Sequence, residues 1–303
     1  MSLLKALVFI SPVLFSLCEQ PFTESEKSPP EGPSKIYIDQ QPDLLPNYAW
    51  LEVYDATETI AHRIPAPAGF RRKALNTGSF GEWLRYLPLK PAGSPVLLYD
   101  GQKKYNQNAH HAVIQIDVGT RDLQQCADAV MRLKAEYHYS RQEWTSIHFN
   151  FSDGTAISFD DWRRGNRPVL NNNSWSIGHG NGTISNSYPN FKKYMNLVFG
   201  YAGTASLEKE LNRIPAVDLQ PGDVFIKGGY PGHAVIVVDI VENEQGEKRF
   251  LLAQSYMPAQ EIHILKNPAN PGNDPWYKIA PSQTLNTPEW TFDWNQLRRF
   301  DKE

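Results

Sequence analysis

Cysteine is scarce in this chain, whose 303 residues include only Cys18 and Cys126. Neither paired C-x-x-C motifs nor an H-E-x-x-H motif occurs, so the sequence offers little support for a zinc site. His110 and His111 are neighbours in an expected strand, where successive side chains face opposite sides, so they are poor joint ligands. We expect neither a metal nor a cofactor.

An excess of basic residues is also lacking. The chain has 30 Lys and Arg against 33 Asp and Glu, a formal charge of −3, and loss of Lys5 with a signal segment would make it −4. This balance argues against a nucleic-acid partner, which would require a basic face. The loop glycines Gly178, Gly180 and Gly182 lack the G-x-G-x-x-G spacing of a dinucleotide site. Aromatic residues are plentiful (8 Trp, 14 Tyr, 14 Phe) and suggest a substantial core and an aromatic-lined groove.

Long apolar runs are absent except near the N-terminus, where residues 6–17 follow the single charge of Lys5. About twelve residues suit the core of a signal peptide and are too few to cross a bilayer, which needs ~20. Cys18 directly follows this run, as in bacterial lipoproteins whose acylated cysteine becomes the new N-terminus. An incidental cysteine in a signal peptide that is cut later is the alternative. We therefore expect a signal segment at 1–18, with Cys18 as a candidate lipidation site.

Residues 19–34 are rich in Pro, Glu and Ser and nearly empty of apolar side chains. Such a segment cannot bury enough surface to offset its ordering entropy, so we expect a disordered tether. Residues 35–303 are long enough for one large domain or two small ones. No charge run, low-complexity stretch or repeat divides them, which predicts a single globular domain of the α+β class.

Capping signals and apolar periodicity predict the elements of this domain. Helices are expected to begin at Ser79 and Asp122 and to cover 191–199 and 206–211. The helix after Asp122 is expected to bury one apolar face, because Cys126, Val130, Leu133 and Tyr137 fall at i, i+4, i+7 and i+11. Strands are expected at 96–99, 112–118, 224–226, 233–241 and 250–254, with a hairpin turn at 243–246 before the last strand. Residues 140–190 are dominated by loop sequence.

Three polar residues in these elements could perform chemistry together. Cys126 begins a helix, where the helix dipole and free N–H groups favour a thiolate and lower the cysteine pKa. His233 enters an apolar strand after the small residues 228–232, which would let a substrate backbone approach closely. Gln254 ends the partner strand, and its amide oxygen could accept a hydrogen bond from one nitrogen of His233 and leave the other to face Cys126. A carboxylate in place of Gln254 would accept the same bond. An inert core cysteine and a hydrogen-bonded core histidine are the alternatives.

The segments QQCADAV and LQPGDVFI…GHAVIVV resemble papain-fold cysteine peptidases of the NlpC and CHAP type, which are bacterial cell-wall hydrolases. The resemblance covers roughly 122–139 and 219–255. It implies a papain-like core in which a helix bearing Cys126 packs on an antiparallel sheet bearing His233, with Gln254 as third residue. The spacing of 107 positions (233 minus 126) implies a large insertion at about 140–200. The whole chain also resembles a bacterial family of secreted, lipoprotein-like proteins defined as a domain of unknown function.

This resemblance also suggests candidates around the three central residues. A side-chain donor to an oxyanion hole would come from Gln124 or Gln125, beside the Cys126 N–H. Candidates for substrate contact lie in the small-residue loop and in the insertion: Gly232, Trp144, Trp162 and Trp175.

Three functions compete at this stage. The first is an exported, surface-tethered cysteine hydrolase that cleaves an amide bond in cell-wall peptide. The second keeps the triad but transfers an acyl group between lipid or ester substrates. The third is a non-catalytic lipoprotein that binds glycan or peptide through the Trp-rich insertion. All three place the protein in the periplasm or cell envelope, with the membrane contacted only through an N-terminal lipid.

Overall fold

The computed structural model describes residues 45–172, 174–180, 182–270, 272 and 274–301, which all fall in a single compact unit. The expected signal segment, Cys18, the tether and the domain boundary at residue 35 lie outside these residues and stay predictions. No helix within the described ranges is long and apolar enough to cross a membrane.

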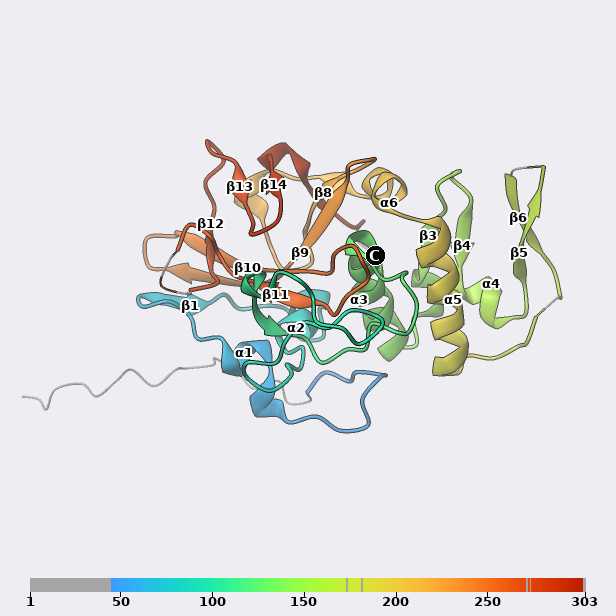
Figure 1. Cartoon of the computed structure of the whole chain (residues 1–303), viewed down its shortest axis with the longest axis horizontal. Coiled ribbons are helices and arrows are strands. Elements are labelled where there is room, and N and C mark those ends of the chain that lie inside the picture. The colour runs from blue at the N-terminus through green and yellow to red at the C-terminus, as the bar shows by residue number, and fades with distance from the viewer. Residues whose placement is uncertain (1–44, 173, 181, 271, 273, 302–303) are drawn as a thin grey trace, which may run out of the picture. The chain divides into compact units, whose positions relative to one another are not determined.

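A nine-stranded antiparallel sheet organises the mixed α/β fold (Figure 1). Seven strands follow in the order β2 (His110–Val113), β11 (His263–Leu265), β10 (Lys248–Gln254), β9 (His233–Asn243), β8 (Val224–Lys227), β15 (Leu297–Arg299) and β7 (Asn212–Arg213). Two further strands pair beside this path: β1 (Phe70–Arg72) with β9, and β12 (Tyr277–Lys278) with β10.

The β9–β10 hairpin is the centre of the sheet and confirms the expected strands and turn. Asn243 closes the turn through its N–H to the carbonyl of Glu247, and Ala253 pairs with Ile236 near the open end. Residues 233–241 of β9 are all buried because both faces of the sheet are covered. Asp239 is the one carboxylate among them, and it is paired with two arginines, Arg72 at 2.8 Å and Arg85 at 2.6 Å.

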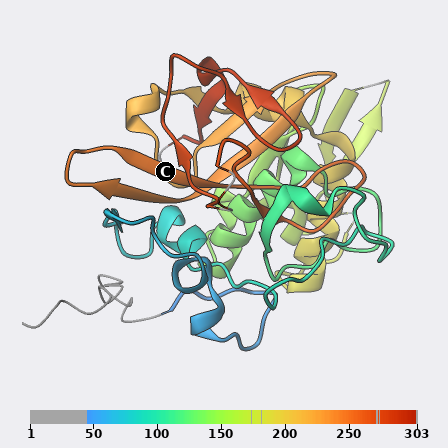
Figure 2. The ribbon, with the colours of Figure 1, turned by 60° about the vertical axis from the view of Figure 1, so that its left-hand side comes forward.

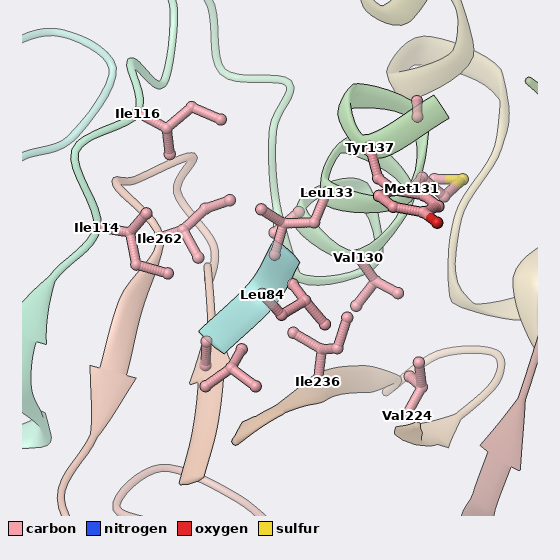
Figure 3. Close-up of a cluster of buried hydrophobic side chains, with 14 of the residues drawn as sticks. Leu84, Ile114, Ile116, Val130, Met131, Leu133, Tyr137, Val224, Ile236 and Ile262 are labelled. Carbon is pink, nitrogen blue, oxygen red and sulfur yellow. The ribbon is translucent and has the colours of Figure 1, made fainter. Parts of the chain in front are cut away.

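Helix α3 (Cys126–Ser140) covers one face of this hairpin. Val130, Leu133 and Tyr137 pack in the cluster that also holds Ile236, so the expected apolar face is confirmed (Figure 3). The helix begins at Cys126 rather than at the expected Asp122 cap. Its N-cap is Gln125, whose N–H donates to the Asp128 carboxylate at 2.9 Å.

The opposite face of the sheet is covered by the C-terminal segment. Here β13 (Leu285–Asn286) and β14 (Thr291–Phe292) form a short hairpin, and Trp294 follows it. Leu285, Phe292 and Trp294 pack against Val235 and Val237 of β9. The two hairpins therefore meet on the face that does not carry α3, as Figure 2 shows from another side.

Residues 140–201 form an insertion with structure of its own beyond the expected loops (Figure 1). It contains two hairpins and two helices: β3 (His148–Asn150) with β4 (Ala156–Ser158), α4 (Phe159–Arg163), β5 (Arg167–Asn171) with β6 (Ser174–Gly178), and α5 (Tyr188–Tyr201). Helix α5 confirms the expected helix and begins earlier, because Pro189 suits the first turn. Its Tyr188 donates to Glu136 of α3 at 2.8 Å and ties the insertion to the core.

The remaining helices are short: α1 (Ile60–Arg63), α2 (Phe80–Arg85) and α6 (Thr204–Glu210). The helix expected after Ser79 is confirmed, since the Ser79 hydroxyl accepts from the Glu82 N–H at 3.2 Å. The strand expected at 96–99 is wrong, because the turn at Asp100–Gly101 reverses the chain and leaves only isolated bridges. The strand expected at 112–118 is displaced to β2, which ends at Val113.

Candidate functional site

Cys126 stands where the N-terminus of α3 meets the start of β9. Burial, together with the nearby Asp128 carboxyl, raises the pKa of the Cys126 thiol to about 11. The backbone N–H groups of Ala234, Ala127 and Cys126 itself lower the pKa by a smaller amount, as a helix N-terminus should. The expected lowering of the cysteine pKa is therefore wrong in direction, because desolvation of the thiolate is the larger effect.

His233 is the first residue of β9 and is 1% exposed. Its Nε2 lies 2.9 Å from the Oε1 of Gln254, which confirms the hydrogen bond expected from the hairpin register. Aromatic rings enclose the imidazole: Tyr256 at 4.7 Å, Trp290 at 5.3 Å and Phe292 at 5.9 Å between centroids. Burial lowers the pKa of His233 to about 4, so the ring is neutral at physiological pH.

The thiol and the imidazole lie at the same end of β9. The backbone N–H of Ala234, the residue after His233, is near enough to Cys126 to lower the pKa of its thiol. Tyr256, which packs on the His233 ring, has its pKa raised by burial and by the nearby Glu289 and Cys126. No hydrogen bond joins the sulfur to the imidazole in this part of the described chain. The expected separation within about 4 Å stays a prediction.

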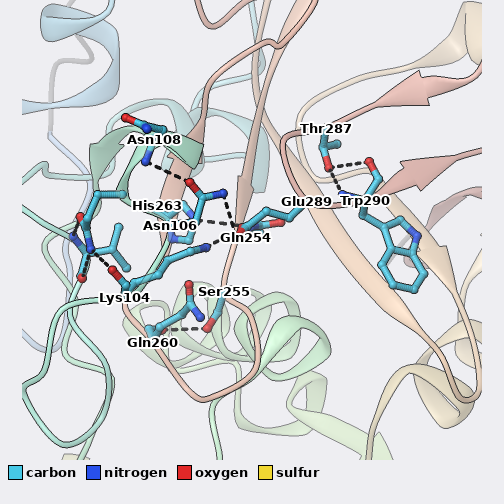
Figure 4. A network of polar contacts seen from close by, with 12 residues as sticks. Lys104, Asn106, Asn108, Gln254, Ser255, Gln260, His263, Thr287, Glu289 and Trp290 are labelled. Atoms are coloured by element: carbon cyan, nitrogen blue, oxygen red, sulfur yellow. Dashed lines mark hydrogen bonds and ion pairs between the residues drawn. The ribbon is translucent and has the colours of Figure 1, made fainter.

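Gln254 belongs to a larger polar network (Figure 4). Its Nε2 donates to Glu289 at 2.8 Å and lies 3.4 Å from Nε2 of His263. Lys104, whose ammonium is 2.5 Å from the same Glu289 oxygen, completes an ion pair with side chains that are 6% and 14% exposed. Gln254, the third residue of the candidate triad, is thus hydrogen-bonded to the ion pair of Lys104 and Glu289.

The two glutamines before Cys126 differ in how they are bound. The Oε1 of Gln124 accepts from Arg132 at 2.5 Å, while its buried Nε2 has no partner within the described structure. Since arginine only donates, the amide oxygen must face Arg132 and the free end must be the NH2 group. The amide of Gln125 instead donates to Asp122 at 3.3 Å. Of the two oxyanion candidates, Gln124 is the one whose NH2 group is buried and has no partner in the described structure.

Gly232 is required by the loop itself. A Cβ at this position would lie 2.3 Å from the Gly229 carbonyl oxygen and 2.5 Å from the Thr204 hydroxyl. The space beside the glycine is therefore filled by Gly229 and Thr204. A role of Gly232 in substrate contact stays a prediction.

Trp144, Trp162 and Trp175 have packing roles in the insertion. Trp144 contacts Tyr139 and Phe159, Trp162 donates to Asn190 at 3.1 Å, and Trp175 packs on Phe151 and Tyr201. All three are half-buried against the main hydrophobic cluster. These three indoles pack against other side chains of the insertion. A role for them in substrate binding stays a prediction.

The residues that sequence reasoning missed are Lys104, Tyr256, Glu289 and Trp290. Lys104 and Glu289 are 185 positions apart, and each stands in a segment with no recognisable motif. The adjacent Glu289-Trp290 pair in a turn between two short strands was the only local signal, and it is weak.

Other places in the molecule offer less for catalysis. A cavity of about 900 Å³ is lined by Phe80, Lys134, Gly222 and Phe300 among others, and it includes none of Cys126, His233 and Gln254. No group of three or more His, Cys, Asp or Glu side chains in the described ranges is arranged to hold a metal ion.

Residues 60–299 match the family described as Domain of unknown function (4846). The match spans well over half of the chain, so the chain belongs to this family. No curated protein and no solved structure matches the chain.

Proposed function

We propose that this member of a family of unknown function is a cysteine hydrolase that cleaves an amide bond. The observation that carries the proposal is the hydrogen bond from His233 Nε2 to Gln254 Oε1, 2.9 Å long, at the end of the strand that Cys126 meets. A buried core histidine could be satisfied by any acceptor. Here the acceptor occupies the place of the third residue in a cysteine–histidine–amide triad.

A papain-like core is part of this proposal. It is supported by α3 with a cysteine as first residue, by the packing of α3 on β9, and by His233 at the start of β9. The polar partner of the histidine comes from the next antiparallel strand, β10. The insertion at 140–201 lies between the cysteine helix and the histidine strand in sequence, as the long spacing requires.

The reaction would begin with transfer of the Cys126 proton to His233 Nδ1 while the sulfur attacks the substrate carbonyl carbon. His233 then returns that proton to the leaving amine, and the C–N bond breaks to give a thioester. Water, deprotonated by the same nitrogen, attacks the thioester and releases the acid and the thiol. The carbonyl oxygen would be bound by the Cys126 N–H and by the spare Nε2 donor of Gln124.

The pKa directions define which protonation states take part. Burial raises the pKa of Cys126 to about 11 and lowers that of His233 to about 4, so both are neutral between these values. The resting pair is a thiol with a neutral base, and proton transfer accompanies the attack. Activity should be lost as the pH falls toward 4, because the imidazole then becomes protonated and can no longer act as base.

Cell-wall peptide is the proposed substrate class, and the cell envelope the proposed location. Both rest on the resemblance of the 122–139 and 219–255 segments to cell-wall hydrolases and on the signal-like run before Cys18. Thioester chemistry at Cys126 would equally serve acyl transfer if an alcohol or amine replaced water in the second step.

A non-catalytic binding protein is the second candidate, and one observation favours it. The cysteine is poorly ionised and the histidine is nearly inaccessible, as expected of inert core residues. In that case, the polar network around Gln254 would serve only to satisfy buried groups.

Alkylation of Cys126 by iodoacetamide, followed by peptide-resolved mass spectrometry, separates the two without a known substrate. A functional pair predicts a rate that is nearly independent of pH from about 5 to 9 and, at pH 7, at least about tenfold above that of His233→Ala. An inert thiol predicts equal rates in both proteins, each rising about tenfold per pH unit. Equal rates would exclude the hydrolase.

A further inference from the structure

The direction of the Gln254 amide is fixed by its neighbours. The carboxylate of Glu289 can only accept hydrogen bonds, so the group 2.8 Å from it must be the NH2 end of the amide. The carbonyl end then faces His233, at 2.9 Å from Nε2. Because a carbonyl also only accepts, Nε2 of His233 carries the proton and Nδ1 carries the lone pair.

His263 acts on the same amide from another side. Its Nδ1 lies 2.9 Å from the carbonyl oxygen of Glu261 and must therefore carry a proton. Burial lowers the pKa of His263 well below the usual value, so the ring is neutral and its Nε2 is an acceptor. That nitrogen lies 3.4 Å from Nε2 of Gln254, close enough for a weaker bond to the second amide hydrogen. Both hydrogens of the NH2 group thus point at acceptors.

Glu289 is placed by the hairpin that also packs on the imidazole. It stands in the turn between β13 and β14, which is closed by hydrogen bonds between Thr287 and Trp290, and Trp290 lies 5.3 Å from the His233 ring. Lys104 forms an ion pair with Glu289 at 2.5 Å in this sheltered position. One short turn therefore controls both the packing and the hydrogen bonding of the candidate base.

We propose that Glu289 is a positioning residue of the site: it orients the Gln254 amide and, through it, holds His233 in the Nε2-protonated tautomer. The inference rests on the proposed function in one respect, namely that this tautomer leaves Nδ1 free to take the Cys126 proton. Without the Glu289 acceptor, the amide can turn around, place its NH2 group against the imidazole, and favour the opposite tautomer, which is useless as a base toward Cys126.

The contact also changes what a carboxylate at position 254 would do. Gln254→Glu would place a second anion about 3 Å from Glu289, and two carboxylates so close cannot both ionise without a large cost. The sequence alone predicts that this variant stays active, and the presence of Glu289 reverses that expectation. Exchanging the two residues, Gln254→Glu with Glu289→Gln, restores one cation and one carboxylate to the network. The exchanged protein should therefore recover the activity that Gln254→Glu alone loses.

The test compares two variants that differ only in the acceptor. Both carry Lys104→Met, which avoids a buried unpaired ammonium; one adds Glu289→Leu and the other, as matched control, Glu289→Gln, which retains an acceptor oxygen. The 15N shifts of the His233 ring report its tautomer. We expect Nε2–H in the wild type and the control, and a substantial Nδ1–H population with Glu289→Leu. A folded Glu289→Leu variant that keeps Nε2–H would overturn the proposal.

Alkylation of Cys126 gives a second measurement. With Glu289→Leu, the rate at pH 7 should fall about tenfold, toward that of His233→Ala, while the Glu289→Gln control stays near wild type. If the tautomer changes as expected but wild type and His233→Ala alkylate equally, the hydrolase fails and the positioning role stands.

If the Glu289→Leu variant does not fold, the proposal is tested with Gln254→Glu and with the exchange of Gln254→Glu and Glu289→Gln. Gln254→Glu should melt lower at pH 8 than at pH 5 relative to wild type, and the added Glu289→Gln should abolish that difference. An unchanged pH dependence in Gln254→Glu would sink the proposal.

Discussion

The beginning and the middle of helix α3 both carry ionisable groups that are at least half-buried, and their surroundings differ. In the middle, Arg132 is 1% exposed and is bound by Gln124, Asp117 and Glu136, at 2.5, 2.9 and 3.3 Å. At the beginning, neither Cys126 nor Asp128 forms an ion pair with any described residue, and burial raises the pKa of both, to about 11 and about 8. In the middle of α3, where the helix contacts the insertion, the charged side chains form ion pairs. At the beginning of α3, where the helix lies near His233, burial favours the neutral forms of the ionisable side chains.

This contrast separates structure from chemistry within one helix. A buried ion pair is costly to break, because the remaining partner is left charged and desolvated, so the middle of α3 resists change. The neutral groups at the beginning form no ion pair with any described residue, so a substitution there leaves no partner charge buried and unpaired. Four substitutions test this contrast, and the one expected to cost most stability comes first.

Arg132→Met should cause the largest loss, about 3–5 kcal/mol in the free energy of unfolding, because Glu136 is left buried without its cation. The loss should be greater at pH 8 than at pH 5, where Glu136, whose pKa is raised by burial, can take up a proton. Urea unfolding measures it, with the exposed Arg121→Met as control. A loss below about 1 kcal/mol would show that the pair is not the attachment of the insertion.

Gln254→Ala should leave the fold intact and lower turnover, or Cys126 alkylation at pH 7, by about tenfold, toward the level of His233→Ala, since His233 loses the acceptor that fixes its tautomer. Gln254→Asn should be poor too, because its amide is one methylene short. Gln283→Ala, on the exposed surface, is the control. Wild-type reactivity in Gln254→Ala would leave at most a Cys126–His233 dyad.

Trp175→Ala should lower the free energy of unfolding by about 1–2 kcal/mol, because the indole packs on Phe151 and Tyr201 in the insertion. Thermal unfolding measures the loss, and Leu170→Ala on the paired strand, where the side chain is 54% exposed, should cost little. Cys126 alkylation should not change. A selective loss of glycan or peptide binding in a stable Trp175→Ala protein would instead support the binding function.

Asp128→Asn should have the smallest effect at low pH, within about 1 kcal/mol at pH 5, because the native carboxyl is then protonated and the amide oxygen can still accept from Gln125. The folded-state pKa of Asp128 is raised to about 8 by burial, above its unfolded value of 3.8. Its contribution to stability is therefore present at low pH and is lost as the pH rises toward 8. Melting temperatures from pH 4 to 8.5 should fall less steeply in Asp128→Asn. Identical slopes would mean that Asp128 is ionised in the fold.

Elements that depend on neighbouring residues could be predicted from the sequence. Apolar alternation and a turn signal predicted the β9–β10 hairpin, and its register, which shifts once between Leu251 and Leu252, brings Gln254 to His233. Periodicity at i, i+4 and i+7 predicted the buried face of α3 and the place of Cys126 at its beginning. These patterns depend on residues a few positions apart, so they can be recognised without the rest of the chain.

The other features of the site depend on contacts between distant parts of the chain. Glu289 contacts Gln254, which is 35 positions away in the sequence, and Lys104, which is 185 positions away. No spacing rule predicts contacts between residues so far apart. The direction of the Cys126 pKa shift could not be predicted from the sequence either, because two effects oppose each other. Backbone N–H groups at the helix start lower the pKa, whereas burial raises it, and burial depends on all the residues packed around the thiol. Local hydrogen-bonding patterns depend on residues that are neighbours in the sequence, so the sequence predicts them. Desolvation and long-range charge pairing depend on the folded chain, because they involve residues from distant segments.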